Sequence, residues 1–141
     1  MRFFFDTSVL IAAVSVQHVH HAPSVELYST AGPGDACYAA HSFAEVYATL
    51  TRMPGRQRMS NEQTLLVLDN IRERLTPIAL TEQDYHSLIS EAAAEGVMGG
   101  TIYDALIARC AIKAKASIIY TWNVDHFRRL GADVAKRVRT P

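Results

Sequence analysis

Short apolar runs alternate with longer amphipathic segments along the 141-residue chain. The apolar runs have the length of buried strands and are bounded by polar residues; they cover residues 2–5, 35–40, 76–80 and 117–121. Other segments have apolar residues at helical spacing, namely 41–52, 61–75, 82–96 and 101–116. Strands that alternate with helices in this way predict an α/β fold with a mainly parallel sheet.

Composition and length fit one globular domain over residues 1–141. Hydrophobic residues make up 49% of the chain and charged residues 20%, close to the globular average. No apolar run approaches the ~18 residues of a membrane span, and no signal peptide is recognisable. We therefore expect a cytoplasmic protein that does not associate with membranes and whose two cysteines are reduced.

The formal net charge is zero, which argues against a protein that binds polyanions through its overall field. Two local basic clusters nevertheless occur, at residues 52–58 and 127–139. Contacts with nucleic acid would therefore depend on local cations.

Four acidic residues follow or adjoin the predicted strands. Asp6 comes directly after the first apolar run, and Glu45 lies one turn into the helix after the second. Asp104 lies near the start of the helix over 101–116, and Asp125 follows the last predicted strand. Ligands of open parallel sheets bind beyond the carboxyl ends of the strands, so we expect Asp6 to face such a crevice.

Each of these acids also has a purely structural interpretation. The segments 42–45 and 101–104 both match a helix capping box, in which the acid satisfies backbone N–H groups. Asp6 could cap a helix that begins at the next residue, and Asp125 could be a solvated loop residue. Taken one at a time, the acids are more easily explained as structural than as functional.

Helical geometry separates two of the acids. At about 100° per residue, Asp104 lies opposite Arg109 and Lys113 and points inward, where an unpaired carboxylate is unfavourable. Glu45 lies off the apolar stripe of its helix, so geometry alone leaves its role open.

Acids gathered at one sheet edge repel one another, by roughly 4 kcal/mol for a pair ~4 Å apart at an effective dielectric of ~20. A bound Mg²⁺ or Mn²⁺ ion would turn this unfavourable interaction energy into a favourable one, and such a site suits phosphodiester hydrolysis.

Aromatic and histidine residues near the acids have open interpretations. The histidines of segment 18–21 are expected in an exposed loop after the first helix. His41 and His126 could touch a substrate, although a surface role is favoured for both. Trp122 could stack on an unpaired base, with a packing role slightly favoured.

Four motifs resemble those of PIN-domain ribonucleases, specifically the VapC-like toxins of bacterial toxin–antitoxin pairs. They are "FFFDTSVLIAA", "SFAEVYATLTRMPG", "YDALIA" and "TWNVDHF", and their order and spacing match over nearly the whole chain. The resemblance implies a compact three-layer α/β/α sandwich with a mainly parallel central sheet. It also implies a homodimer, an RNA substrate with transfer RNA as the suggested class, and a cognate antitoxin whose peptide enters the active-site groove.

The resemblance also assigns roles to individual residues. It implies that Asp6, Glu45 and Asp104 bind Mg²⁺ or Mn²⁺. Ser8 and Thr121 are then expected to orient the ligands or the attacking water through hydrogen bonds. The function that follows is a metal-dependent endoribonuclease toxin.

The closing motif departs from the commonest family pattern, which has an acid two residues after the threonine. This chain has Asn123 at that position, and Asp125 is nearby. The fourth ligand is therefore Asp125, directly or through a water molecule, or Asn123. The departure favours an alternative function, a catalytically weak RNA-binding module that acts by occupying its target. A phosphatase is disfavoured, because no nucleophilic DxD motif follows the first strand.

Overall fold

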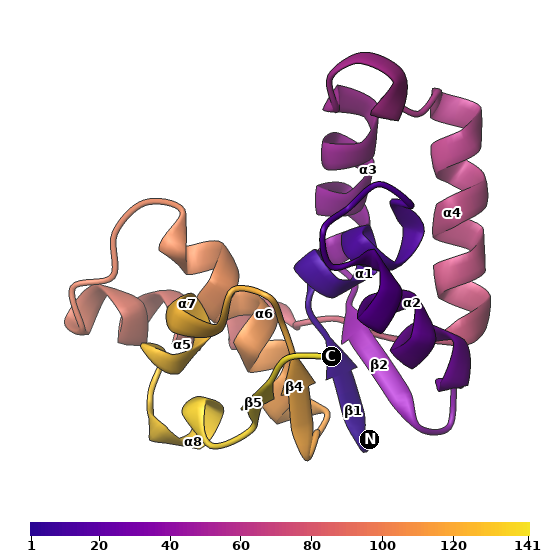
Figure 1. Ribbon diagram of the computed structural model, residues 1–141. Coiled ribbons are helices and arrows are strands. Elements are labelled where there is room, and N and C mark those ends of the chain that lie inside the picture. Colours follow the sequence, from indigo (N-terminus) through magenta and orange to yellow (C-terminus); the bar gives the residue numbers. More distant parts are fainter.

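A parallel sheet forms the centre of the computed structural model, which describes all residues, 1–141 (Figure 1). Its five strands are β1 (Phe3–Phe5), β2 (Ala36–Ala39), β3 (Thr76–Ile78), β4 (Ile118–Tyr120) and β5 (Val138–Arg139). Their order across the sheet is β3-β2-β1-β4-β5, and every neighbouring pair is parallel. The predicted α/β class with a parallel sheet is confirmed, and β1 is its central strand.

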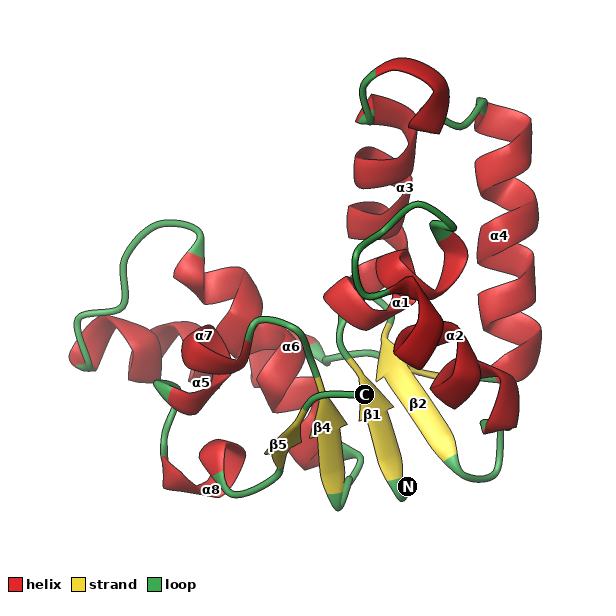
Figure 2. Ribbon diagram, in the orientation of Figure 1, coloured by secondary structure: helices red, strands yellow, loops and turns green.

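Helices cover both faces of the sheet, which gives the predicted three layers (Figure 2). One layer contains α1 (Thr7–Val14), α2 (His21–Thr30), α3 (Ser42–Arg52) and α4 (Asn61–Arg74). The other contains α5 (Glu82–Ala94), α6 (Thr101–Lys113), α7 (Val124–Arg128) and α8 (Ala132–Ala135). A 3₁₀ turn, η1 (Gly55–Gln57), follows α3. In Figure 1, α3 and α4 extend together as a hairpin beyond the sheet.

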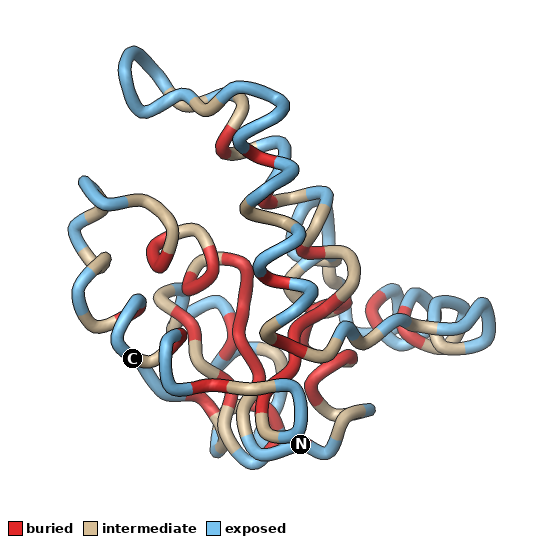
Figure 3. The backbone as a smooth tube through the Cα atoms, turned by 90° about the vertical axis from the view of Figure 1, so that its right-hand side faces the viewer, coloured by how far each residue is buried: buried red, intermediate tan, exposed pale blue.

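Alternation along the strands divides the core between the two layers. Phe5 of β1 and Tyr38 of β2 pack against the layer of α1 to α4, whereas Phe4 and Cys37 pack against α5 to α8. Both cysteines are buried and form no disulfide, as expected. Figure 3 shows the buried stretches of the chain concentrated in the middle of the molecule.

Helix caps resolve one of the structural alternatives for the acids. α4 and α5 begin at complete capping boxes, with Ser60 and Thr81 as the capping residues. The capping boxes predicted for segments 42–45 and 101–104 do not form, because neither α3 nor α6 has a side-chain cap. The acids of those two segments are therefore not engaged in satisfying helix termini.

Several short elements escape the sequence patterns. α2 starts inside the segment 18–21, which was expected to be an exposed loop, so that expectation is only partly correct. α2 also lacks a clear apolar stripe, and α7, α8 and β5 are too short to show a period. None of the helices combines the length and the apolar character that crossing a bilayer requires.

Candidate active site

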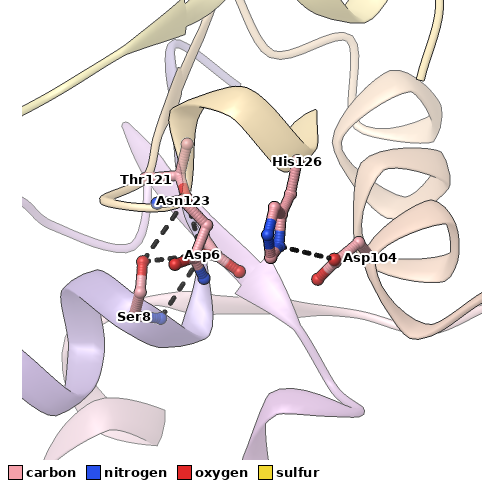
Figure 4. A network of polar contacts seen from close by, with 6 residues as sticks. All are labelled: Asp6, Ser8, Asp104, Thr121, Asn123 and His126. Atoms are coloured by element: carbon pink, nitrogen blue, oxygen red, sulfur yellow. Dashed lines mark hydrogen bonds and ion pairs between the residues drawn. The ribbon is translucent and has the colours of Figure 1, made fainter. Parts of the chain in front are cut away.

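Asp6 lies at the carboxyl end of the central strand β1 and caps α1. The residue is only 2% exposed. Its Oδ2 atom accepts hydrogen bonds from Ser8 Oγ at 2.7 Å, from Thr121 Oγ1 at 2.7 Å and from the Ser8 backbone N–H at 3.4 Å (Figure 4). All of these bonds go to one carboxylate oxygen, so Oδ1 keeps its lone pairs for another ligand.

Backbone groups orient the two hydroxyls that hold Asp6. The Trp122 N–H donates to Ser8 Oγ at 3.0 Å, and the Asn123 N–H donates to Thr121 Oγ1 at 2.9 Å. Each hydroxyl thus accepts a bond from the chain that follows β4 and directs its own proton to the Asp6 carboxylate. The position of Asp6 is therefore set by contacts between segments more than 100 residues apart in sequence.

Glu45 lies in the first turn of α3, next to the residue that follows Asp6. The Thr7 hydroxyl donates to Glu45 Oε1 at 3.1 Å and also lies 2.8 Å from the Ser42 Oγ atom. His41 Nε2 lies 3.7 Å from the same Glu45 oxygen. These contacts turn Glu45 toward the carboxyl end of β1, which the sequence left open.

Asp104 lies in the first turn of α6, on the opposite helical layer. Its side chain is 25% exposed, and its Oδ2 atom lies 3.4 Å from His126 Nδ1 on α7 (Figure 4). The surface role favoured for His126 is therefore incomplete, since this histidine contacts one of the acids. The inward orientation predicted for Asp104 agrees with its partial burial.

Electrostatics link the three carboxylates. Burial is the main cause that raises the pKa of Asp6, and the bonds from Ser8 and Thr121 oppose it. Burial also raises the pKa of Glu45, and the negative charges of Asp6 and Asp104 raise it further, against the Thr7 bond and His41. The pKa of Asp104 is raised by burial and lowered by His126. A cation among them would favour all three charged forms.

The donor set suits a hard divalent cation. Each of the three carboxylates has one oxygen engaged by a hydroxyl or a histidine and a second oxygen that accepts no hydrogen bond. As the side chains lie, no three acidic, histidine or cysteine groups converge on one point for an ion. Oxygen ligands from carboxylates are nevertheless those that Mg²⁺ and Mn²⁺ prefer, so the chemical type of these donors fits such an ion.

The structure does not join Asp125 to this group. Asp125 is exposed on α7, and no hydrogen bond or ion pair connects it to the other acids. Asn123 is also exposed but belongs to the network through its N–H bond to Thr121 (Figure 4). The contacts of Thr7 and His41 with Glu45 were not predicted from the sequence, although the i,i+4 spacing of His41 and Glu45 was a signal for one of them.

The basic segment 52–58 lies at the far tip of the α3–α4 hairpin. Arg52 follows Glu45 by seven positions in the same helix, which is roughly 10 Å along the axis at ~1.5 Å per residue. Arg56 and Arg58 line a cavity of about 500 Å³ at this tip, together with methionine and valine side chains. The cavity is therefore separate from the acids.

Comparisons with known proteins agree with this architecture. The family model described as "PIN domain" matches residues 3–133. Ribonuclease VapC27 of Mycobacterium tuberculosis is 31% identical over 114 residues, which cover 80% of this chain and 79% of that protein. Ribonuclease VapC40 of the same species is also 31% identical over 114 residues, with 81% of each chain covered.

Solved structures show the same fold at lower identity. The M. tuberculosis toxin VapC20, described as cleaving the Sarcin-Ricin loop, superposes with a TM-score of 0.73 at 14% identity, over 94% of this chain and 98% of that one. VapBC2 from Rickettsia felis, bound to a fragment of its promoter DNA, gives a TM-score of 0.67 at 21% identity, over 100% and 99%. At these identities the two structures establish the fold alone.

Proposed function

Because this chain belongs to the PIN domain family and, within it, to the VapC ribonucleases, we propose that it is an endoribonuclease toxin that hydrolyses RNA phosphodiester bonds with Mg²⁺ or Mn²⁺. The observation that carries the proposal is the set of carboxylates at the carboxyl edge of the sheet. Asp6, Glu45 and Asp104 come from three different elements, and each has a raised pKa. Buried acids with shared perturbations of this kind are typical of functional sites.

In this proposal Asp6, Glu45 and Asp104 would hold the ion. When bound, the ion would supply an activated water and would stabilise negative charge on the phosphate oxygens. Ser8 and Thr121 donate hydrogen bonds to Oδ2 of Asp6 and so fix the orientation of the carboxylate, including that of its other oxygen, Oδ1. The 2% exposure of Asp6 excludes bulk water from its anchored side.

Asn123 is the proposed fourth ligand of the ion, with Asp125 as the alternative. Asn123→Asp would restore the acid of the commoner family pattern beside Thr121 and should tighten Mn²⁺ binding by roughly 10-fold, the scale of supporting ligands. Asp125→Ala removes an exposed carboxylate and should leave the Mn²⁺ affinity unchanged. Isothermal titration calorimetry on both variants decides the question, since a 10-fold loss in Asp125→Ala would make that residue the ligand instead.

The proposed partners follow from the relatives. VapBC2 of R. felis and VapBC-1 of nontypeable Haemophilus influenzae are structures of toxin–antitoxin pairs, and this chain shares their fold. We propose that a cognate antitoxin binds and inhibits this chain by placing a peptide in the groove beside the acids. Assembly as a homodimer, action in the cytoplasm and transfer RNA as the substrate class belong to the same proposal.

Sequencing of RNA ends after brief expression without antitoxin tests the proposed function. The wild type should create new 5′ ends at discrete positions, and Asp104→Asn should create none and should not arrest growth. A target-occupying RNA-binding module predicts a different result: growth arrest by both proteins, with no new ends. That result would replace the ribonuclease proposal with the alternative.

A further inference from the structure

The Asp104 carboxylate has a single polar partner in the structure, and that partner is a histidine on a neighbouring helix. The Nδ1 atom of His126, on α7, lies 3.4 Å from Asp104 Oδ2 (Figure 4). The carboxylates of Asp6 and Glu45 accept hydrogen bonds from hydroxyl groups, whereas no hydroxyl or backbone N–H group bonds to Asp104. The orientation of the Asp104 side chain therefore depends on His126.

The backbone that carries His126 is held in place from two sides. Its neighbour Phe127 is fully buried and anchors α7 in the core, and the Phe127 backbone N–H donates to the Asn123 carbonyl oxygen at 3.2 Å. α7 also packs against α6, the helix that carries Asp104. The imidazole thus faces Asp104 from a fixed backbone, although the His126 side chain itself is 61% exposed.

The His126 ring makes no other polar contact in the fold. Neither of its ring nitrogens forms a hydrogen bond or an ion pair with any group besides Asp104. The ring of His18, by contrast, accepts a hydrogen bond from the His20 backbone N–H at 3.0 Å and so belongs to a local turn. A mainly exposed ring contributes little to the core, so the contact of His126 is better explained by the site than by stability.

We propose that His126 is a positioning residue for Asp104, whose Oδ2 atom accepts a hydrogen bond from the Nδ1–H group while Oδ1 is left for the ion. The inference rests on the proposed function and deepens it. It extends to Asp104 the arrangement observed at Asp6, where donors hold one carboxylate oxygen and leave the other free. Although 3.4 Å is long for such a bond, hydrogen bonds of active sites are often long before the site is filled and tighten afterwards.

Substitutions that move the donor test this inference through Mn²⁺ binding, without depending on cleavage. The amide nitrogen of asparagine is as many bonds from Cα as the Nδ1 atom of histidine, and that of glutamine as many as Nε2. His126→Asn should therefore keep the Mn²⁺ affinity within about threefold of wild type, whereas His126→Gln and His126→Phe should each lower it by roughly 10-fold or more, the scale of partners that orient a metal ligand. Isothermal titration calorimetry measures the three affinities.

His86 on α5 provides the matched control, because it is also an exposed histidine but has no contact with the acids. His86→Phe should bind Mn²⁺ as wild type does. Thermal melting in EDTA checks the fold, and the substitutions at both histidines should leave the melting temperature nearly unchanged, since both side chains are exposed.

Electron spin echo spectroscopy of the bound Mn²⁺ separates positioning from direct ligation, because an imidazole nitrogen on the ion gives a nitrogen coupling. We expect no such coupling in wild type. Equal Mn²⁺ affinity in wild type and His126→Phe, equal losses in His126→Asn and His126→Phe, or a nitrogen coupling that His126→Phe removes would each overturn this inference alone. Absence of Mn²⁺ binding by wild type would overturn the proposed metal site as well, so the two failures are distinguishable.

Discussion

Asp6→Asn is expected to abolish RNA cleavage while the fold is retained. The asparagine carbonyl can accept the hydrogen bonds that Ser8 and Thr121 donate to Oδ2, so the geometry of the site is preserved and only the charge is lost. The rate should fall by roughly 100-fold or more, since even outer-shell partners of a metal ligand are worth ~10–100-fold. Cleavage of a labelled RNA with Mg²⁺ in excess measures the effect.

Asp6→Ala is the matched comparison for this variant. Alanine removes the charge together with the bonds from Ser8 and Thr121 and the N-cap of α1. It should be as inactive as Asp6→Asn but less stable, because loss of an N-cap alone destabilises a protein by about 1 kcal/mol. Cleavage by Asp6→Asn at the wild-type rate would remove Asp6 from the site.

Without divalent cations, the buried acids should make the wild type less stable as the pH rises from about 4 toward neutrality. The pKa values of Asp6, Glu45 and Asp104 are raised above 3.8, 4.5 and 3.8 in the folded state. Over that window the folded state binds more protons than the unfolded state, so the free energy of unfolding falls with increasing pH. Mn²⁺ added at neutral pH should reverse the loss.

Other acids titrate in the opposite sense, so the experiment needs the Asp6→Asn variant as a reference. Lys113 holds the pKa of Asp84 down to about 2, and Lys136 lowers the pKa of Asp133, which favours folding as the pH rises at the acidic end. Above pH 5, chelated Asp6→Asn should melt higher than chelated wild type, at about 2–4 °C per kcal/mol. Equal melting temperatures at every pH, with or without Mn²⁺, would contradict the account of Asp6.

The position of Asp6 could be predicted because it follows from one local rule. An acid directly after a buried parallel strand lies at the carboxyl edge of the sheet, whatever the rest of the chain does. Asp104 could be placed inward because the cationic face of its helix was evident in the sequence. The orientation of Glu45 could not be predicted in this way, since it depends on the contact with Thr7, which lies 38 residues earlier in the chain.

The remaining features depend on strand order, which the sequence patterns did not specify. The stacked His20–Trp122 pair forms because β4 lies beside β1, and the stacked His41–Tyr103 pair forms because α6 packs against β2. The elements after β4 are too short to show a hydrophobic periodicity, so the position of Asp125 relative to Asn123 was not predictable. The contact of His126 with Asp104 depends on the same short helix.

The proposal that these carboxylates form a metal-dependent ribonuclease site is tested most directly by removing and returning the cation during RNA cleavage. Purified wild-type protein should cut RNA with Mg²⁺ or Mn²⁺, should stop when EDTA is added, and should resume when either ion is restored in excess. Asp104→Asn should remain inactive in all of these conditions while keeping its fold. Cleavage that persists in EDTA, or that is equal in wild type and Asp104→Asn, would contradict the account.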